Sequence, residues 1–572
     1  MIFDIKYIAE LKEQITNPDK WNKNQFIAFN YEAGTGKTTL AQRILGEMKY
    51  DSSNKVLYVQ RFSKDDQLKK TVDAINSFTG GRKVAYSFES GNNRKEQRRL
   101  KKLIPIYEVL CITHNMYIQI CKGEHKELIQ NRSILIIDEY PDFLRMVPIS
   151  SSEISDLWYM SKKIGLGIEE MATLLRDLND QHGKPMWFNY LKLDNSAYEK
   201  YRKSIKSALT KIDDKEMLKV LQKCQHLFNN GGFLHEGGFL SFDEKHQMVM
   251  LKNNIILDAN AGFDYRYALS DKFVVNHQKK VFEYDNQTFH HFDVKTTKTA
   301  LKNDVNFERD ALLKISLEGK KAVLFVTQQS SVENVRTAIV NHFLKHGNSI
   351  EEIERNLNCK IKIDYFGHII GVNTYRDFDM VVLLKTPNYE YSAYAMTYFY
   401  YKLLDSKPIE DVLMYEHAEV ENIRKTVIAG EMYQAIKRIN RDNSQHTDIY
   451  IFSDSQDVID LVLKELPKIK YLKKEMGEEK KNKGKERVEK IENTKSSKVK
   501  AMLIETKEAG IPSISKKELR EKLEIHDAPY FGRMLKSSSM ELFLNSNNMI
   551  NKGQKIIFLD NLDEDGDMFV SA

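Results

Sequence analysis

The segment Gly34-Thr35-Gly36-Lys37-Thr38-Thr39 has the residue types that bind a phosphate chain. It follows the apolar run 26–29 and precedes a helical pattern, which is the strand–loop–helix context of a phosphate loop. Glycines let successive N–H groups point at phosphate oxygens, and the helix N-terminus adds positive potential. The lysine reaches the β- and γ-phosphates, and the first threonine completes a Mg²⁺ shell. We predict that ATP with Mg²⁺ is bound by Ala33, Gly34, Thr35, Gly36, Lys37, Thr38 and Thr39.

A second segment ends in two carboxylates, Asp138 and Glu139, after the aliphatic run 134–137. If that run is a buried parallel strand, Asp138 lies beside the phosphate loop and shares the Mg²⁺ shell with Thr38. Glu139 is then placed to polarise the attacking water. Taken alone, such a run is more often a strand ending at a turn, but the phosphate loop upstream favours a site. Tyr31 departs from the usual loop pattern GxxxxGK[ST], which has Gly or Ala at that position.

The stretch 431–441 predicts a helix that carries Gln434, Arg438 and Arg441. The two arginines are spaced i, i+3 and therefore share one helical face. Two guanidinium groups on one face, with a glutamine one turn earlier, suit contact with a γ-phosphate across a domain cleft. The alternative interpretation is a solvated basic helix face.

Short apolar runs that alternate with helical patterns predict an α/β protein with two parallel sheets. We expect lobe one at 1–145, continued at about 246–300, a mainly helical insertion at 146–245 and lobe two at 301–466. A charged linker (467–498), a small unit (499–559) and an acidic tail (560–572) follow. The expected strands are 26–29, 56–59, 108–112, 134–137, 255–257, 322–326, 380–384 and 448–452.

The motifs resemble those of superfamily 2 (DEAD-like) helicases of the phage, mobile-element or bacterial type. The stretch 434–441, QAIKRINR, is similar to their last motif, QxxGRxxR, and Asp138-Glu139-Tyr140-Pro141 is similar to their DExx box. The stretch 257–261 is similar to their third motif, which links ATP state to strand grip. The resemblance implies two RecA-like lobes and further nucleotide contacts from a fifth motif at Gly371, Asn373 and Asp377. It also implies strand contacts by Arg61, Thr113, His114 and Asn115.

The sequence departs from the family pattern at two points. Lys437 replaces the glycine of the last motif, and Asn260 stands where the third motif more often has Ser or Thr. Family members with an iron–sulfur domain carry four clustered cysteines between the first two motifs, whereas only Cys111 and Cys121 lie there. We therefore predict no such cluster.

The C-terminal stretch 499–559 predicts three helices and a hairpin, the plan of a winged helix. Ser515 and Glu518 form a capping-box pattern at the start of one helix. Tyr530, Arg533 and Lys536 would face a groove or phosphates. A helical lid or an oligomerisation module is the alternative. The basic run 94–102 is a further candidate for backbone contact, although a solvated surface is the ordinary interpretation of such a run.

The net charge of +6 over 572 residues argues only weakly for a nucleic-acid partner. No apolar run approaches the roughly 20 residues of a membrane span, and no secretory signal is visible. The four cysteines are scattered without a CxxC pair, so we expect a reduced, cytoplasmic protein without a membrane partner. Three functions stay open: a DNA helicase or translocase, an RNA helicase, and a nucleic-acid-stimulated ATPase that remodels or senses without unwinding. Protein partners would bind through the insertion or the C-terminal unit.

Overall fold

The computed structural model describes residues 5–61, 66–89, 104–165, 167–182, 186–243, 248–369, 374–476, 495–523, 525–536, 540, 543–544 and 547–561. The chain divides into two compact units, Met1–Lys474 and Glu475–Ala572. Within these described ranges, no helix has the length and apolar character needed to cross a membrane.

The first lobe is built on a seven-stranded parallel sheet. Its central strands are apolar at every position because helices cover both faces. On β5, Ile134 and Ile136 pack with α1, α2 and α3, whereas Leu135 and Ile137 join the core on the opposite face, which includes residues of α5. The strand order is β11 (Phe273–Asn276), β1 (Phe26–Phe29), β10 (Asn253–Leu257), β5 (Ile134–Asp138), β2 (Val56–Gln60), β4 (Val109–Thr113) and β3 (Ala85–Ser87). The helices are α1 (Ile5–Thr16), α2 (Lys37–Glu47), α3 (Gln67–Ser77) and α5 (His114–Cys121).

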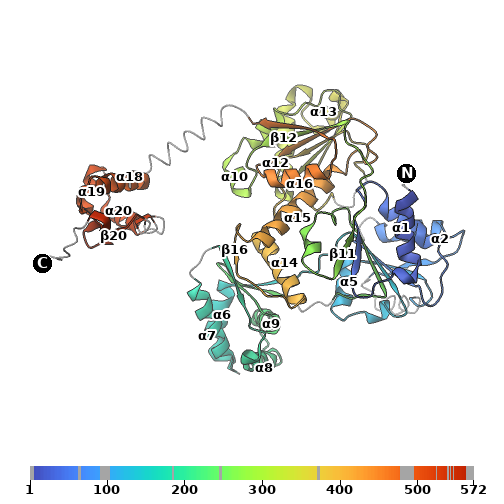
Figure 1. Cartoon of the computed structure of the whole chain (residues 1–572), viewed down its shortest axis with the longest axis horizontal. Helices are drawn as coiled ribbons and strands as arrows, with labels where there is room; N and C mark the ends of the chain where they lie inside the picture. The colour runs from blue at the N-terminus through green and yellow to red at the C-terminus, as the bar shows by residue number, and fades with distance from the viewer. Residues whose placement is uncertain are drawn as a thin grey trace. The chain divides into compact units, whose positions relative to one another are not determined.

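The second lobe is built on a six-stranded sheet, shown in Figure 1 with α12, α13 and α16 around it. The strand order is β14 (Lys360–Tyr365), β13 (Ala322–Thr327), β15 (Met380–Leu383), β17 (Thr447–Phe452), β12 (Gln287–Asp293) and β18 (Lys470–Glu475). Its helices are α10 (Lys298–Asn303), α11 (Phe307–Leu312), α12 (Val332–His342), α13 (Ile350–Leu357), α15 (Ala418–Ile436) and α16 (Gln456–Lys464). The predicted α/β class with two parallel-sheet lobes is confirmed, and every expected strand is present.

The second sheet extends beyond the expected limits of its lobe at both ends. β12 lies within the range predicted for lobe one, yet it pairs in parallel with β17, with His290 opposite Tyr450. Its two histidines and flanking polar residues hide its buried pattern from a sequence reading. β18 lies at the start of the predicted charged linker and forms the sheet edge, where Lys470 and Lys473 are exposed.

The insertion is mainly helical as predicted, but it also contains an antiparallel sheet. Helices α6 (Ser151–Ile164), α7 (Ile168–Gln181), α8 (Glu199–Leu209) and α9 (Lys215–Asn230) share one apolar core. The sheet order is β16 (Val412–Leu413), β7 (Trp187–Leu191), β8 (Gly232–His235), β9 (Gly238–Phe242) and β6 (Met146–Ser150).

One strand of the insertion's sheet comes from lobe two. β16 and the aromatic helix α14 (Tyr391–Leu404) lie beside the insertion, as Figure 1 shows. Phe188 stacks on Tyr391, and Tyr190 stacks on Phe399. Hydrophobic residues of lobe one, the insertion and α14 thus form one continuous core.

The C-terminal unit has the element order helix, strand, helix, helix, strand, strand. Its elements are α18 (Lys495–Glu508), β19 (Ser513–Ser515), α19 (Lys516–Lys522), α20 (Ala528–Leu535), β20 (Met549–Lys552) and β21 (Lys555–Phe558). β21 pairs antiparallel with both other strands. Ser515 caps α19 by accepting a hydrogen bond from the Glu518 N–H at 3.0 Å, as the capping pattern predicts.

Candidate active site between the two lobes

The phosphate loop joins β1 to α2 with the predicted geometry. Gly34 and Gly36 have φ angles of +92° and +89°, a region that side-chain-bearing residues rarely adopt. The Thr35 hydroxyl donates to the Glu32 carbonyl at 2.8 Å and closes the turn. The loop backbone therefore curls ahead of Lys37, the first residue of α2.

Asp138 ends β5 directly beside this loop. The Thr38 hydroxyl donates to Asp138 Oδ2 at 2.7 Å, and the Tyr58 hydroxyl donates to the same oxygen at 3.2 Å. Burial raises the pKa of Asp138, and Lys37 opposes that shift. Oδ1 is buried and has no hydrogen-bond partner among the described residues. An unshared carboxylate oxygen next to a threonine hydroxyl fits a Mg²⁺ shell, which Thr38 and Asp138 would hold.

Glu139 has a constrained backbone and a cationic environment. Its φ is +73°, and its N–H donates to the Leu257 carbonyl of β10 at 3.0 Å. Burial by itself raises the pKa of Glu139, but Lys37, Arg438 and Arg61 hold that pKa below its ordinary value. The carboxylate is therefore ionised at neutral pH, as an acceptor for a water proton must be.

The arginines of lobe two lie on a turn and not on a helical face. α15 ends at Ile436, whereas the sequence predicted a helix over 431–441. Asn440 adopts φ +39°, and its side-chain amide donates to the Gln445 carbonyl at 2.7 Å, which turns the chain. Arg438 is only 6% exposed, and the charge of Glu139 acts on it from the opposite lobe. The turn thus presents a lobe-two guanidinium to the lobe-one carboxylate.

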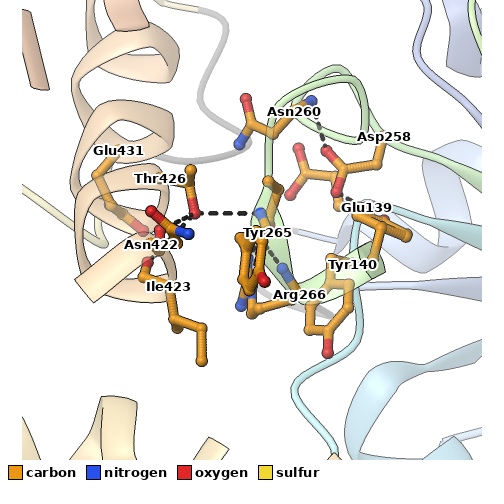
Figure 2. Close-up of polar contacts among 12 residues, drawn as sticks. Glu139, Tyr140, Asp258, Asn260, Tyr265, Arg266, Asn422, Ile423, Thr426 and Glu431 are labelled. Atoms are coloured by element: carbon orange, nitrogen blue, oxygen red, sulfur yellow. Dashed lines mark hydrogen bonds and ion pairs between the residues drawn. The ribbon is translucent and has the colours of Figure 1, made fainter. Parts of the chain in front are cut away.

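Several buried polar atoms of this region have no hydrogen-bond partner among the described residues. They come from both lobes, and unsatisfied buried groups are rare unless a ligand satisfies them. Figure 2 shows two of the side chains concerned, with Asn260 on one side and Glu431 on the helix opposite. These atoms are Asp138 Oδ1, Asn260 Oδ1, Glu431 Oε2, Gln434 Oε1 and Arg438 Nε.

The loop that follows β10 in lobe one contacts helix α15 of lobe two. The Tyr265 N–H donates to Thr426 Oγ1 at 3.1 Å (Figure 2). Asn260 packs against Gly430, where an added Cβ would lie 2.9 Å from the amide nitrogen. The Arg266 guanidinium lies 4.0 Å from the centre of the Tyr140 ring. The third-motif segment and the carboxylate motif are therefore in contact with each other and with lobe two.

Glu32 and Lys437, which sequence reasoning did not connect, lie in one buried cluster. The Glu32 carboxylate accepts from the Val281 N–H at 2.8 Å and from the Tyr284 hydroxyl. The Lys437 ammonium lies 4.8 Å from the Phe282 ring centre and 4.7 Å from the Tyr284 ring centre. Burial lowers the pKa of Lys437 to about 8, although Glu32 opposes the shift. The lysine at the glycine position of the last motif is thus packed against the segment joining the lobes.

The Lys437→Met variant is expected to be more stable than the wild type at pH 7. The wild type keeps a buried cation whose pKa is about 8 when folded and 10.5 in the ordinary state. Its removal should add on the order of 3 kcal/mol, at about 1.4 kcal/mol per pKa unit. Because the unfolded lysine binds more protons, this difference should shrink as pH rises from 8 to 10.5. Thermal melts of the variant and the wild type at pH 7 and pH 9.5 measure this stability difference, and Lys468→Met is the control at an exposed lysine. An equal gain in stability at both pH values would contradict the prediction.

Gly34→Ala is expected to impair ATP hydrolysis by keeping the phosphate loop and the lobe-two turn apart. An added Cβ would lie 2.4 Å from the Arg441 carbonyl oxygen, and φ is +92°. Backbone strain of this kind costs about 1 to 3 kcal/mol. Gly80→Ala is the matched control, because its φ is +69° and nothing lies within 4 Å of the added Cβ. Steady-state hydrolysis should fall about tenfold in the first variant only; equal effects would show that strain alone is responsible.

The remaining predicted site residues are distributed as follows. His114 is buried behind the carboxylates, with Nε2 3.0 Å from the Asp138 carbonyl oxygen, and burial lowers its pKa to about 4. Thr113 caps α5, and Asn115 Oδ1 lies 3.4 Å from Arg145. The Asp377 side chain is 90% exposed and pairs with Arg376. Gly371, Asn373, the side chains of Tyr530 and Arg533, and the basic run 94–102 lie outside the described residues.

The fold and the phosphate loop define a P-loop protein with two RecA-like lobes. No protein-family model and no curated protein matches the sequence. Among solved structures, Xpd4 of S. tokodaii is similar with 14% identity, 82% of this chain and 100% of that chain covered, and a TM-score of 0.48. S. cerevisiae Dbp5 bound to RNA and ADP BeF3 is similar with 11% identity, 84% of this chain and 93% of that chain covered, and a TM-score of 0.34. The helicase MrfA bound to DNA and AMPPNP is similar with 11% identity, 79% of this chain and 50% of that chain covered, and a TM-score of 0.36.

Proposed function

We propose that this protein is an ATP-dependent helicase or translocase of the superfamily 2 type that acts on DNA. The observation that carries the proposal is that the phosphate loop, two carboxylates and an arginine come together from two lobes. Lobe one contributes Lys37, Thr38, Asp138 and Glu139, and lobe two contributes Arg438 on a turn whose Arg441 carbonyl meets Gly34. A site completed only when the lobes meet couples hydrolysis to lobe movement.

The residues have separate roles in this proposal. Lys37 and the loop N–H groups hold the phosphates, while Thr38 and Asp138 hold Mg²⁺. Glu139 orients the attacking water and takes its proton. Arg438 and Arg441 stabilise the charge that develops on the γ-phosphate, and Gln434 senses the nucleotide from the last turn of α15. The contact of the β10 loop with Thr426 supports transmission of that state between the lobes.

The C-terminal unit is proposed to be a winged helix that holds duplex DNA through phosphate contacts. The winged-helix order of its elements supports this, as do its exposed lysines. Lys536 lies close enough to Lys516 to lower the pKa of that lysine, although burial is the larger cause. Lys552 and Lys555 extend this positive charge onto the exposed β20–β21 hairpin. Phosphate contacts of this kind are weakened by salt.

The test is ATP hydrolysis without polymer and with single-stranded DNA, duplex DNA or RNA, followed by strand displacement on tailed duplexes. Stimulation by DNA with displacement supports the proposal. Stronger stimulation by RNA identifies an RNA helicase, and stimulation without displacement identifies a remodeller or sensor. Lys37→Ala should abolish the stimulated activity; if activity persisted in that variant, the ATP site would be wrongly assigned.

A further inference from the structure

Arg61 joins the predicted strand-binding edge of lobe one to the carboxylate Glu139. It follows β2, which lies next to β5 in the sheet, so the two residues emerge at the same sheet edge. Arg61 Nη1 lies 3.6 Å from Glu139 Oε2. The Arg61 side chain is 37% exposed, and that of Glu139 is 20% exposed. The guanidinium is therefore open to solvent on one side and faces the proposed general base on the other.

Only the side chain of Glu139 is free to respond to this cation. Its backbone is held at φ +73° by the N–H bond to Leu257, so the Cα position is fixed by the sheet. A carboxylate paired with a guanidinium is a weaker acceptor for a water proton, and it is drawn toward its partner. The ion pair thus restrains the group that must orient the attacking water.

The Arg61 guanidinium also interacts electrostatically with a second carboxylate, that of Glu431 on the other lobe. Glu431 lies on α15, where burial raises its pKa and Arg61 is the largest opposing influence. The Tyr389 hydroxyl lies 3.4 Å from Glu431 Oε1. Arg438, a third neighbour, is repelled by Arg61 and attracted by both carboxylates. Arg61 therefore sits where the charges of the two lobes meet.

We propose that Arg61 is a positioning residue that restrains Glu139 until a backbone phosphate of a bound strand takes over the guanidinium. A phosphate approaching the exposed side competes for the same N–H donors and leaves the carboxylate free to orient water. Binding of a strand would in this way raise the rate of hydrolysis at a site the strand does not touch. The inference rests on the proposed function, because it needs a polyanion at this edge of lobe one.

The experiment compares Arg61→Gln with the wild type in steady-state ATP hydrolysis, with and without saturating single-stranded DNA. Without DNA, kcat should rise about 2- to 5-fold, the range for a partly exposed ion pair, while KM for ATP stays unchanged. With DNA, the variant should gain less than the wild type does. Arg61→Lys should restore the low basal rate, because an ammonium can still pair with Glu139.

Arg43→Gln is the matched control, since Arg43 pairs with Glu47 on the exposed face of α2 and should leave both rates unchanged. The proposal would be wrong if the basal rate of Arg61→Gln were equal to or below the wild-type value. It would also be wrong if the basal rate of Arg61→Lys rose as much as that of Arg61→Gln. If neither DNA nor RNA stimulates the wild type, the proposed function fails. In that case the basal rate of Arg61→Gln still decides whether the ion pair restrains Glu139.

Discussion

Arg438→Ala is expected to bind ATP nearly as well as the wild type and to hydrolyse it about 10³-fold more slowly. The Arg438 guanidinium is buried in lobe two, and its Nε has no hydrogen-bond partner among the described residues. It faces the charge of Glu139 across the cleft, where the γ-phosphate of ATP held by Lys37 would lie. We therefore expect the Arg438 charge to stabilise the transition state of phosphoryl transfer and to contribute little to ATP affinity.

The measurement separates kcat from affinity. A fluorescent-nucleotide titration gives the affinity, and phosphate release gives kcat for the same preparation. Lys425→Ala is the matched control, because Lys425 lies on α15 and pairs with Asp457 at the surface. Its kcat should equal that of the wild type. If ATP affinity fell as much as kcat, Arg438 would act mainly by binding ATP before the reaction. If kcat were unchanged, Arg438 would have no role in hydrolysis.

Glu139→Gln is expected to lower kcat by about 10²- to 10⁴-fold, the usual contribution of a general base. The amide keeps the size and hydrogen-bonding reach of the carboxylate but cannot accept the proton of the attacking water. Mg²⁺ and ATP should still bind, because Thr38 and Asp138 are unaltered. A stable ATP complex should accumulate, and it should retain nucleic acid longer than the hydrolysing wild type does.

Single-turnover hydrolysis and nucleotide binding in one buffer test this prediction. Glu47→Gln provides a surface control on α2, where the side chain pairs with Arg43. A Glu139→Gln variant that hydrolyses ATP within a few-fold of the wild type would assign proton acceptance to another group. Loss of ATP binding would instead indicate a structural role for the carboxylate.

Local sequence chemistry was sufficient to predict the elements that we propose hold the phosphates. The GTGKTT loop has few conformations open to it, and its glycines adopt the left-handed φ angles that the pattern requires. The aliphatic runs of lobe one could be assigned because strands buried on both faces are apolar throughout. β12 and β18 were harder to place, because polar or exposed residues interrupt their patterns.

The spacing of Arg438 and Arg441 predicted one helical face, but the helix ends at Ile436. Beyond it, the Asn440 side-chain amide donates a hydrogen bond to the Gln445 carbonyl, a contact that helix propensity does not register. The cluster of Glu32 with Lys437 was also beyond prediction. Residues far apart in the chain meet there through the segment that joins the lobes.

The sequence by itself determined the groups that we propose bind the nucleotide phosphates, because the loop, the lysine and the carboxylates are encoded in short contiguous stretches. The tertiary structure decided which groups share the cleft. It placed Arg61 against Glu139, set Gly34 against Arg441, and joined β16 of lobe two to the insertion's sheet. These arrangements depend on strand order and lobe packing. Contacts between distant segments arise only when the sheets assemble, so no local pattern records them.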